Sequence, residues 1–529
     1  MREREVQVLR NARLVGIAGA GSETAGPGSE TAGPGSETTG PRSETTGPGA
    51  GLVDVVIARG RIVAVAPGAD APVGAEETDL DGRWLLPGLV DHHVHFATWA
   101  RQRARVDVSS ARSARQAAGI IADAVKAGAA ARSGTLVARG FQDALWPATP
   151  TADLLDRAAA DGGQPGLPVA VISHDLHAVW LNAAAAARYG APHAGLLREA
   201  DAFAAEQAID AEAAPRTAGL LADAVAAATA RGVTGIVDLQ MEDNLAAWRE
   251  RIAGGVTGLR VRAGLYLSHL ESAVERGVRT GDEVPGTGGL LTAGPLKLFS
   301  DGSLNTRTAL CSHAYGDAPA LPRGGYGHAA HEPEALRAHL ARAREAGLEI
   351  ALHAIGDLAV TWALDAFEAT GARGSVEHAQ LVRPEDVPRF AALGVTASVQ
   401  PQHAMDDRDV ADAVWADRAQ DAFPYGALAR AGARLAFGSD APVAPLDPWV
   451  AIAAAVARTD DDREPWQSAN AVTVEQALAA SVAFPKVSPG RPADLVAVER
   501  DPFTASGAEL RTMPVAFTVC AGQVTHSAL

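Results

Sequence analysis

Residues 85–96, LLPGLVDHHVHF, end an apolar run in three histidines and one aspartate. Successive side chains of a strand point to opposite faces, so Asp91, His93 and His95 share one face and His92 points to the other. Two imidazoles on one face, one pleat apart, can bind a single metal ion. The alternative is a pair of core histidines satisfied by hydrogen bonds. The motif therefore predicts a metal site and needs support from the rest of the chain.

Further residues of ligand type end later apolar runs. They are Lys297 in PLKLF, His353 in ALHAIGD, His378 in VEHAQ and Asp440 in FGSDAPV. Only three of the 46 basic residues are lysines, which suggests that Lys297 is present for its amine. An ordinary lysine paired with Asp301 is the alternative at that position. For Asp440 the alternative is a turn or N-cap aspartate before Pro442.

Eight short apolar runs separated by Ala-rich helical stretches predict parallel β/α units. The runs are 88–95, 234–240, 261–267, 295–299, 349–355, 374–380, 395–401 and 435–442. Eight units predict an α/β fold, a closed (β/α)8 TIM barrel, in which catalytic groups lie at the C-terminal ends of the strands. The candidate residues occupy those ends.

The barrel is expected over residues 87–485, with an insertion at 96–233 that packs over the barrel mouth and shapes a pocket. Residues 1–86 and 486–529 carry short strands with turn signals and are expected to form one small β-sandwich. Within the first part, residues 21–49 contain a seven-residue repeat, GSETAGP and variants, without large apolar side chains. Such a segment should be a disordered surface loop.

The composition narrows the classes of partner. The 529 residues carry a net charge of -17, which disfavours nucleic acid. There is no signal sequence and no uncharged 18-residue apolar stretch, so neither export nor a membrane partner is expected. Cys311 and Cys520 are too few for a disulfide framework and fit a reducing cytoplasm. We expect a cytoplasmic protein with a small-molecule substrate; whether it forms a homodimer stays open.

The ordered set His-x-His, Lys, His, His, Asp, introduced by PGLVDHHVHF, resembles the amidohydrolase superfamily of metal-dependent hydrolases. The phrases GPLKLFSDGSLNTRTA, HAIGD, EHAQ, GSDAPV and SHDLHAVWLN are similar to the branch (amidohydrolase family 3) that contains N-substituted formamide deformylases. The likeness covers nearly the whole chain except the repeat. That repeat and the short join SVAFPKVSPGRPADLV depart from the family pattern, and both concern the terminal β-unit.

The resemblance implies a divalent cofactor, Zn2+ or a similar ion, with one or two ions per chain. His93, His95 and Asp440 would hold one ion, and His353 and His378 a second. A lysine ammonium has no lone pair, so the bridging role implied for Lys297 requires carboxylation to a carbamate. Asp440 would be the catalytic residue that accepts a proton from the attacking water.

Substrate contacts are expected from His177, Asp301, Arg307 and Gln402. His177 lies in the insertion, where capping or packing is the alternative. Arg307 follows the lysine strand, where a solvated salt bridge is the alternative. Gln402 and its neighbour His403 end the seventh strand, where loop packing is the alternative.

These features predict an enzyme that hydrolyses a carbon–nitrogen bond other than a peptide bond, in an amide, N-acyl or N-formyl compound, by metal-activated hydroxide. A cyclic amide or imide hydrolase, or an aminoheterocycle deaminase, is the alternative chemistry, because the same hydroxide can attack a ring carbon. A barrel scaffold without catalysis is the alternative from another class, and the complete ligand set argues against it.

Overall fold

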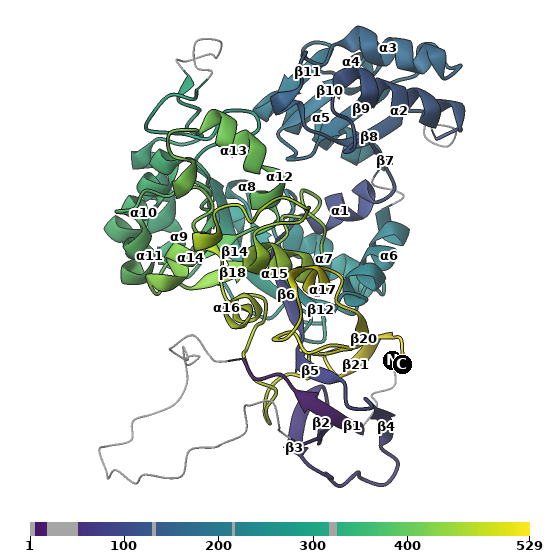
Figure 1. Cartoon of the computed structure of the whole chain (residues 1–529), viewed down its shortest axis with the longest axis vertical. Coiled ribbons are helices and arrows are strands. Elements are labelled where there is room, and N and C mark those ends of the chain that lie inside the picture. Colours follow the sequence, from purple (N-terminus) through teal and green to yellow (C-terminus); the bar gives the residue numbers. More distant parts are fainter. Residues whose placement is uncertain (1–5, 18–50, 130–133, 214–216, 317–324) are drawn as a thin grey trace.

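The computed structural model describes residues 6–17, 51–129, 134–213, 217–316 and 325–529. The repeat predicted to be disordered at 21–49 lies outside these residues. Figure 1 shows three units from bottom to top: a small sheet formed by strands from both ends of the chain, a central barrel, and an α/β unit with its own sheet.

The central unit is a parallel sheet of eight strands in the order β18-β17-β16-β15-β14-β13-β12-β6. The strands are β6 (Leu89–Val94), β12 (Val233–Asp238), β13 (Arg260–Leu265), β14 (Leu291–Phe299), β15 (Ile350–Ala354), β16 (Gly374–His378), β17 (Thr396–Val399) and β18 (Leu435–Phe437). Each overlaps one of the eight predicted runs. Helices surround the sheet, and the predicted (β/α)8 TIM barrel is confirmed.

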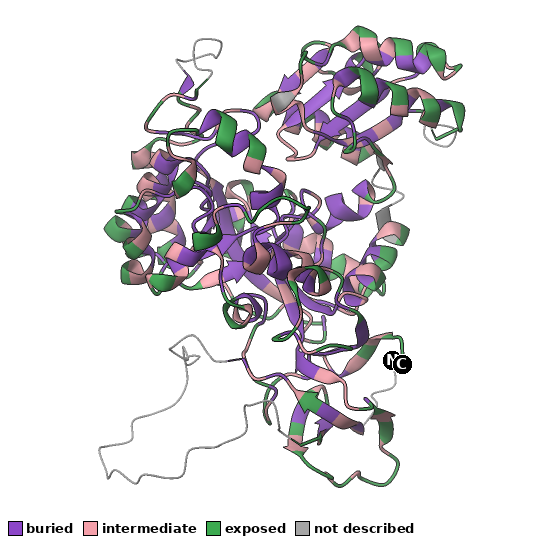
Figure 2. Cartoon of the chain, viewed as in Figure 1, coloured by how far each residue is buried: buried purple, intermediate pink, exposed green. Residues whose placement is uncertain are grey.

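Helices cover the outside of the barrel. They are α6 (Thr217–Thr229), α7 (Asn244–Ala253), α8 (Leu267–Glu275), α9 (Pro333–Glu345), α10 (Asp357–Thr370), α11 (Val387–Leu393), α14 (Tyr425–Arg430) and α15 (Pro448–Ala457). Strands β12 and β15 are buried along their whole length, as expected for parallel strands covered on the outside by helices and filled on the inside by side chains. Figure 2 shows this buried interior and the exposed outer faces of the helices.

The barrel closes between its first and last strands by backbone contacts beyond the end of β18. The N–H of Asp440 donates to the carbonyl of His93 at 2.7 Å, and the N–H of His95 donates to the carbonyl of Ala441 at 2.8 Å. Gly438 makes this approach possible, because a Cβ at that position would lie 2.6 Å from Cβ of His93. Closure therefore brings the histidines of β6 against the segment that carries Asp440.

Strands from both ends of the chain form a second sheet, ordered β21-β20-β19-β5-β1-β2-β3 with β4 paired to β1. They are β1 (Val6–Leu14), β2 (Val53–Ala58), β3 (Arg61–Ala66), β4 (Glu76–Asp79), β5 (Trp84–Pro87), β19 (Leu495–Val498), β20 (Val515–Cys520) and β21 (Gln523–Ser527). One apolar core joins the two ends, with Leu9 and Val55 packed together with Leu495 and Phe517. Strand β5 leads directly into β6 and so connects this sheet to the metal motif.

The segment between β6 and β12 carries a five-stranded sheet of its own, ordered β11-β10-β9-β8-β7. Its elements are β7 (Val106–Asp107), α2 (Ala114–Lys126), β8 (Leu136–Phe141), α3 (Ala152–Asp161), β9 (Val169–Ser173), β10 (Ala178–Leu181), α4 (Ala183–Tyr189), β11 (Gly195–Arg198) and α5 (Glu199–Ala213). The flanking helices α1 (Phe96–Gln102) and α6 pack on each other and share a core with barrel strand β12. They join this unit to the barrel.

Four short helices complete the part of the chain that concerns the site. They are α12 (His403–Asp406), α13 (Arg408–Val414), α16 (Val474–Ala479) and α17 (Gly507–Arg511). Within the described ranges, none of the helices has both the length and the apolar character needed to cross a bilayer.

Candidate metal centre

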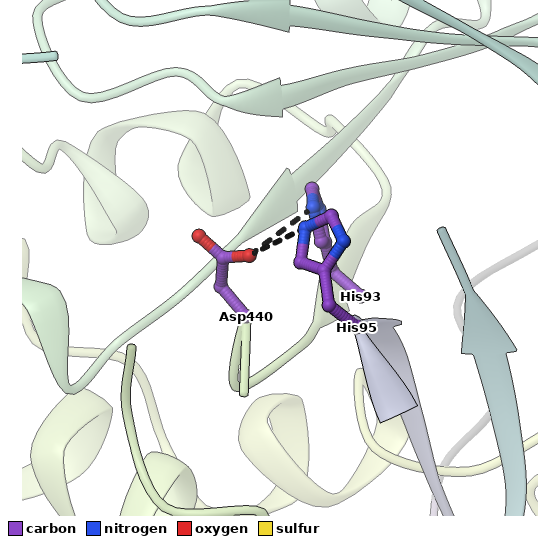
Figure 3. A group of neighbouring side chains, drawn as sticks. All are labelled: His93, His95 and Asp440. Atoms are coloured by element: carbon purple, nitrogen blue, oxygen red, sulfur yellow. Dashed lines mark ion pairs between the residues drawn. The ribbon is translucent and has the colours of Figure 1, made fainter. Parts of the chain in front are cut away.

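His93, His95 and Asp440 meet at one end of the barrel. Figure 3 shows the two imidazoles at the end of β6 facing the carboxylate, which comes from the loop after β18. Oδ1 of Asp440 lies 3.4 Å from Nε2 of His93 and 3.3 Å from Nε2 of His95. The shared face predicted for the two histidines therefore converges on a carboxylate 345 positions or more along the chain.

The backbone at this junction is held in an unusual conformation. Asp440 has φ of +55°, in the left-handed region that few residues other than glycine occupy. Asp91 fixes the same junction, because its Oδ1 accepts from the N–H groups of His93 (3.1 Å) and Ser439 (2.9 Å). Burial raises the pKa of Asp91 to about 7. Asp91 is thus engaged in hydrogen bonds to the backbone, and His93, His95 and Asp440 are the candidate ligands.

Glu377, on strand β16, orients His93 through a hydrogen bond. Nδ1–H of His93 donates to Oε2 of Glu377 at 2.6 Å, and both side chains are buried. Burial opposes ionisation of Glu377, but the hydrogen bond from His93 holds the pKa of that carboxyl below its usual value. With Nδ1 so occupied, Nε2 of His93 is free to face a cation.

Sequence analysis missed Glu377, although it precedes a predicted ligand in VEHAQ. Strict alternation would place Glu377 and His378 on opposite faces of β16. The chain leaves the extended conformation at His378, where φ is +74°, and both side chains reach the centre. A carboxylate among apolar residues at a strand end was the available signal.

Lys297 projects from β14 into the same centre. Its Nζ lies 3.4 Å from Nε2 of His93 and 5.2 Å from the centroid of the Phe299 ring. Burial lowers the pKa of Lys297, which favours the neutral amine. The pairing with Asp301 considered from the sequence does not form, because the Asp301 carboxylate accepts from the backbone N–H groups of Leu310 and Gly356.

Three more histidines surround this point. The ring centroid of His378 lies 5.0 Å from that of His93 and 4.5 Å from that of His353. The ring of His403, at the start of α12, is stacked 6.2 Å from that of His378. Burial lowers the pKa of His353, His378 and His403, so these imidazoles are neutral, as metal ligands must be.

The donor set fits a divalent cation. The ligating atoms of His93, His95 and Asp440 all lie within 4.8 Å of one another, and so do those of His378, His403 and Asp440. Nδ1 of His378 and Nε2 of His403 are buried and have no hydrogen-bond partner among the described residues. An unpaired buried polar atom costs about 1–3 kcal/mol, and a bound cation would remove that cost. Imidazole and carboxylate donors suit Zn2+ and similar ions.

A cavity of about 340 Å³ opens onto these residues. The barrel contributes all six of the predicted ligands to its wall, and the inserted unit contributes residues 174–177 and one side of α5. Phe203 of α5 and Leu304 add apolar surface. The volume falls in the range of pockets for small molecules.

His177 reaches the cavity from the inserted unit. Its Nδ1 lies 2.9 Å from Oε2 of Glu199, and its ring centroid lies 6.1 Å from that of His353. Burial alone would lower the pKa of His177, but the Glu199 carboxylate raises it to about 9. Glu199 is fixed in turn by the hydroxyls of Thr306 and Thr308. His177 is therefore a cation at neutral pH, held at the cavity wall.

The other three predicted substrate contacts do not line the cavity. Asp301 binds backbone N–H groups at the end of β15, and Arg307 donates to the carbonyls of Asn305 and Ala144. Gln402 donates to Asp406 and Asp460 and accepts from Arg511. The roles of Asp301, Arg307 and Gln402 in substrate binding stay predictions. The hydrogen bonds that these three residues form hold together the loops around the cavity.

Comparison with known proteins agrees with this geometry. A family model described as "Amidohydrolase family" matches residues 76–526. The protein YtcJ of Bacillus subtilis (strain 168), which is named an amidohydrolase, is 28% identical over 500 residues, covering 85% of this chain and 90% of its own. The N-substituted formamide deformylase of Arthrobacter pascens is 27% identical over 205 residues, covering 35% of this chain and 38% of its own.

Among solved structures, an uncharacterized metal-dependent hydrolase from Pyrococcus horikoshii OT3 superposes with a TM-score of 0.72. The match covers 95% of this chain and 99% of that chain at 24% sequence identity. Likeness at this level of identity establishes a shared fold.

Proposed function

The chain belongs to the amidohydrolase family. From this premise we propose that it hydrolyses a carbon–nitrogen bond other than a peptide bond, in an amide, N-acyl or N-formyl compound. The resemblance to this superfamily is confirmed, and membership supports a metal-dependent hydrolase. The observation that carries the proposal is the convergence of His93, His95 and Asp440, whose ligating atoms lie within 4.8 Å of one another at the cavity.

The first ion would be held by Asp440 together with His93 of β6 and His95, which directly follows that strand. The family resemblance implies that His353 and His378 would hold a second ion and that a carboxylated Lys297 would belong to the same centre. A divalent ion would supply Lewis acidity, which polarises a substrate carbonyl and lowers the pKa of water enough to provide hydroxide at neutral pH. The position of Lys297, with Nζ 3.4 Å from Nε2 of His93, supports its assignment to this centre.

Asp440 is the residue that moves the proton. Burial alone would raise its pKa, but the neighbouring His93 and His95 hold the pKa of Asp440 well below its usual range, so the carboxylate is ionised. It accepts a proton from the attacking water and returns that proton to the departing nitrogen, which lets the amine leave as a neutral group. This transfer is general acid–base catalysis by one carboxylate.

His177 is placed to stabilise the substrate oxygen. Its Nδ1 is engaged by Glu199, which leaves Nε2–H as the donor available to the cavity. A positively charged donor aimed at a developing oxyanion stabilises the transition state more than the ground state. The inserted unit thus supplies a catalytic group as well as a wall, and the small cavity limits the substrate to a small molecule.

The test is metal-dependent turnover by the full chain. Protein stripped by a chelator and reconstituted with Zn2+, Co2+ or Mn2+ is assayed against N-formyl amines, N-acyl amines, dipeptides and cyclic imides, with metal content measured in parallel. We expect an amine and a carboxylic acid to be released only by the reconstituted protein, and the Asp440→Asn variant to be inactive. Hydrolysis that survives metal removal, or a single ring-opened product, would contradict the proposal.

A further inference from the structure

The inserted unit contributes a polar face to the cavity as well as apolar surface. Residues of α5 that are spaced by three or four positions lie on one face of that helix and line the cavity: Phe203, Glu206, Gln207 and Asp210. This face carries none of the predicted metal ligands. It is therefore placed to contact the part of a substrate that lies away from the metal centre.

Carboxylates outnumber cationic side chains on the described wall of the cavity. Arg101 and Lys297 are its arginine and its lysine, and the charge of His177 is balanced by Glu199. Besides Asp440, six carboxylates line the cavity: Asp175, Glu206, Asp210, Glu242, Asp406 and Asp407. A concave wall with this excess of negative charge attracts a cation.

Five of these six carboxylates accept hydrogen bonds from neighbouring side chains. Asp210 accepts from Nη2 of Arg101 and, at 2.6 Å, from Nη2 of Arg105. The other four are bonded in pairs or small groups: Asp175 to Ser173 and Ser303, Glu242 to Arg251, Asp406 to Gln402, and Asp407 to Asn305. These five carboxylates are therefore already engaged.

Glu206 is the exception. Its Oε1 is buried and has no hydrogen-bond partner within the described ranges, which leaves Oε2 as the atom accessible from the cavity. Burial raises the pKa of Glu206 to about 7, and the charge of Asp210 adds to this rise, while Arg101 and Arg105 oppose it without reversing it. A carboxylate without a donor is costly in such a place, and a positively charged ligand would remove that cost.

The surface next to Glu206 suits an alkyl chain. Phe203 lies one helical turn before Glu206, and its ring centroid is 5.3 Å from that of His177. Met241, which is 41% exposed, adds apolar surface to the same cavity. An aromatic ring beside a carboxylate matches an alkylammonium group, because the ring contacts the methylene groups and attracts the cation while the carboxylate accepts its N–H groups.

We propose that Glu206 is a specificity-determining residue that binds a protonated amine on the part of the substrate remote from the hydrolysed bond. The substrate class is then an N-acyl or N-formyl amine that carries a second, positively charged amino group at the end of an apolar chain. The inference rests on the proposed function, because it assumes that the amide is hydrolysed at the metal centre. Both ends of such a molecule face one cavity of about 340 Å³.

The experiment varies the charge at the remote end of the substrate. Full-length protein reconstituted with Zn2+ is assayed against N-formyl and N-acetyl derivatives of three series of equal chain length: α,ω-diaminoalkanes, alkylamines and ω-amino acids. The proteins are the wild type, Glu206→Gln and Glu206→Asp. Glu334→Gln is the matched control, because Glu334 is 80% exposed on α9 and pairs with Arg337.

We expect the wild type and the control to prefer the cationic over the neutral series by about 10–100-fold in kcat/KM, as a hydrogen bond between charged groups provides. Glu206→Gln should lose this preference through a higher KM with little change in kcat, and Glu206→Asp should retain part of it. Rates on the neutral series should be the same in all four proteins. Equal losses on all three series would indicate a structural role for Glu206 and would overturn the inference, as would a wild type that prefers the neutral or the anionic series.

Calorimetry with alkyldiammonium and alkylammonium ions measures the same contact without turnover, and circular dichroism verifies that each variant is folded. The diammonium ion should bind more tightly than the monoammonium ion to the wild type, and this difference should disappear in Glu206→Gln. An equal difference in both proteins would overturn the inference. If no amide were hydrolysed but diammonium binding still depended on Glu206, the proposed function would fail and the amine subsite would stand.

Discussion

Replacing Glu377 tests whether a buried carboxylate sets the tautomer of His93, a proposed metal ligand. In the wild type Nδ1–H of His93 donates to Glu377 at 2.6 Å, and the two side chains are 1% and 3% exposed. Glu377→Gln keeps the size and an acceptor oxygen but removes the charge. Glu377→Ala removes the acceptor altogether. In both variants Nε2 of His93 should face the cation less often.

The size of the effect follows from this geometry. Carboxylates that orient a histidine ligand typically contribute 10–100-fold to metal affinity, and each tenfold corresponds to about 1.4 kcal/mol. We expect a loss of about tenfold for Glu377→Gln and about 100-fold for Glu377→Ala. In metal-free protein, Glu377→Ala also leaves a buried N–H unpaired, which should lower the free energy of unfolding by about 1–3 kcal/mol.

The assay is competition for Zn2+ with a chromophoric chelator, combined with denaturant unfolding of the metal-free protein. Glu349→Gln is the matched control, because Glu349 pairs with Arg262 at 3.2 Å with both side chains 44% exposed, where ion pairs contribute little. If Glu377→Ala bound Zn2+ within twofold of the wild type, Glu377 would have no part in orienting His93.

Three further predictions concern the same centre. Bicarbonate should raise both the metal occupancy and the rate of hydrolysis of the wild type, and should change neither in Lys297→Met, as measured by metal analysis and initial rates. An equal response of the two proteins would exclude a carbamate at Lys297. In the folded protein, burial lowers the pKa of His177 but the Glu199 carboxylate raises it to about 9, above the ordinary value of 6.5. The pairing with Glu199 therefore stabilises the fold fully below about pH 6.5, and this stabilisation is lost as the pH rises through 9. The difference in thermal unfolding midpoint between the wild type and His177→Gln should therefore shrink from pH 6.5 to 9, and a constant difference would refute the assignment. Chelation should lower the unfolding midpoint of the wild type, because a ligand at 100 times its Kd stabilises by about 2.7 kcal/mol. In scanning fluorimetry the shift should be smaller for Asp440→Asn, which lacks one proposed ligand, and a shift equal to that of the wild type would contradict this assignment.

The barrel strands could be predicted because their residues are apolar on both faces and short helical stretches separate them. β12, for example, is buried at every position, which is typical of parallel barrel strands. Pairing of the terminal strands was also visible in their alternation. The order of strands within the terminal sheet was not, because β1 pairs with β2, β4 and β5 through contacts that no local pattern specifies.

For the site, the sequence identified side chains at the ends of strands, but not a side chain that reaches the site because the backbone leaves the extended conformation. His93 and Lys297 follow from strand position alone, and the structure brings them within 3.4 Å. Glu377 was hidden by the break in alternation at His378. The contact between Nε2 of His353 and the carbonyl of Gly302 depends on the path of a loop, which has no local signature in the sequence.

The barrel closes at the same place where the candidate metal centre lies. β18 has only three residues, Leu435–Phe437, and the contact with β6 is completed by the segment that carries Asp440 rather than by a longer ladder. That contact places Asp440 and the buried Asp91 close enough for the charge on Asp440 to raise the pKa of Asp91, after burial itself. Two carboxyl groups are thus forced together where the strands join, which is unfavourable without a compensating positive charge. A cation bound by His93, His95 and Asp440 would supply that charge and tie the first strand to the last, so the groups that complete the fold are the ones that we propose to hold the ion.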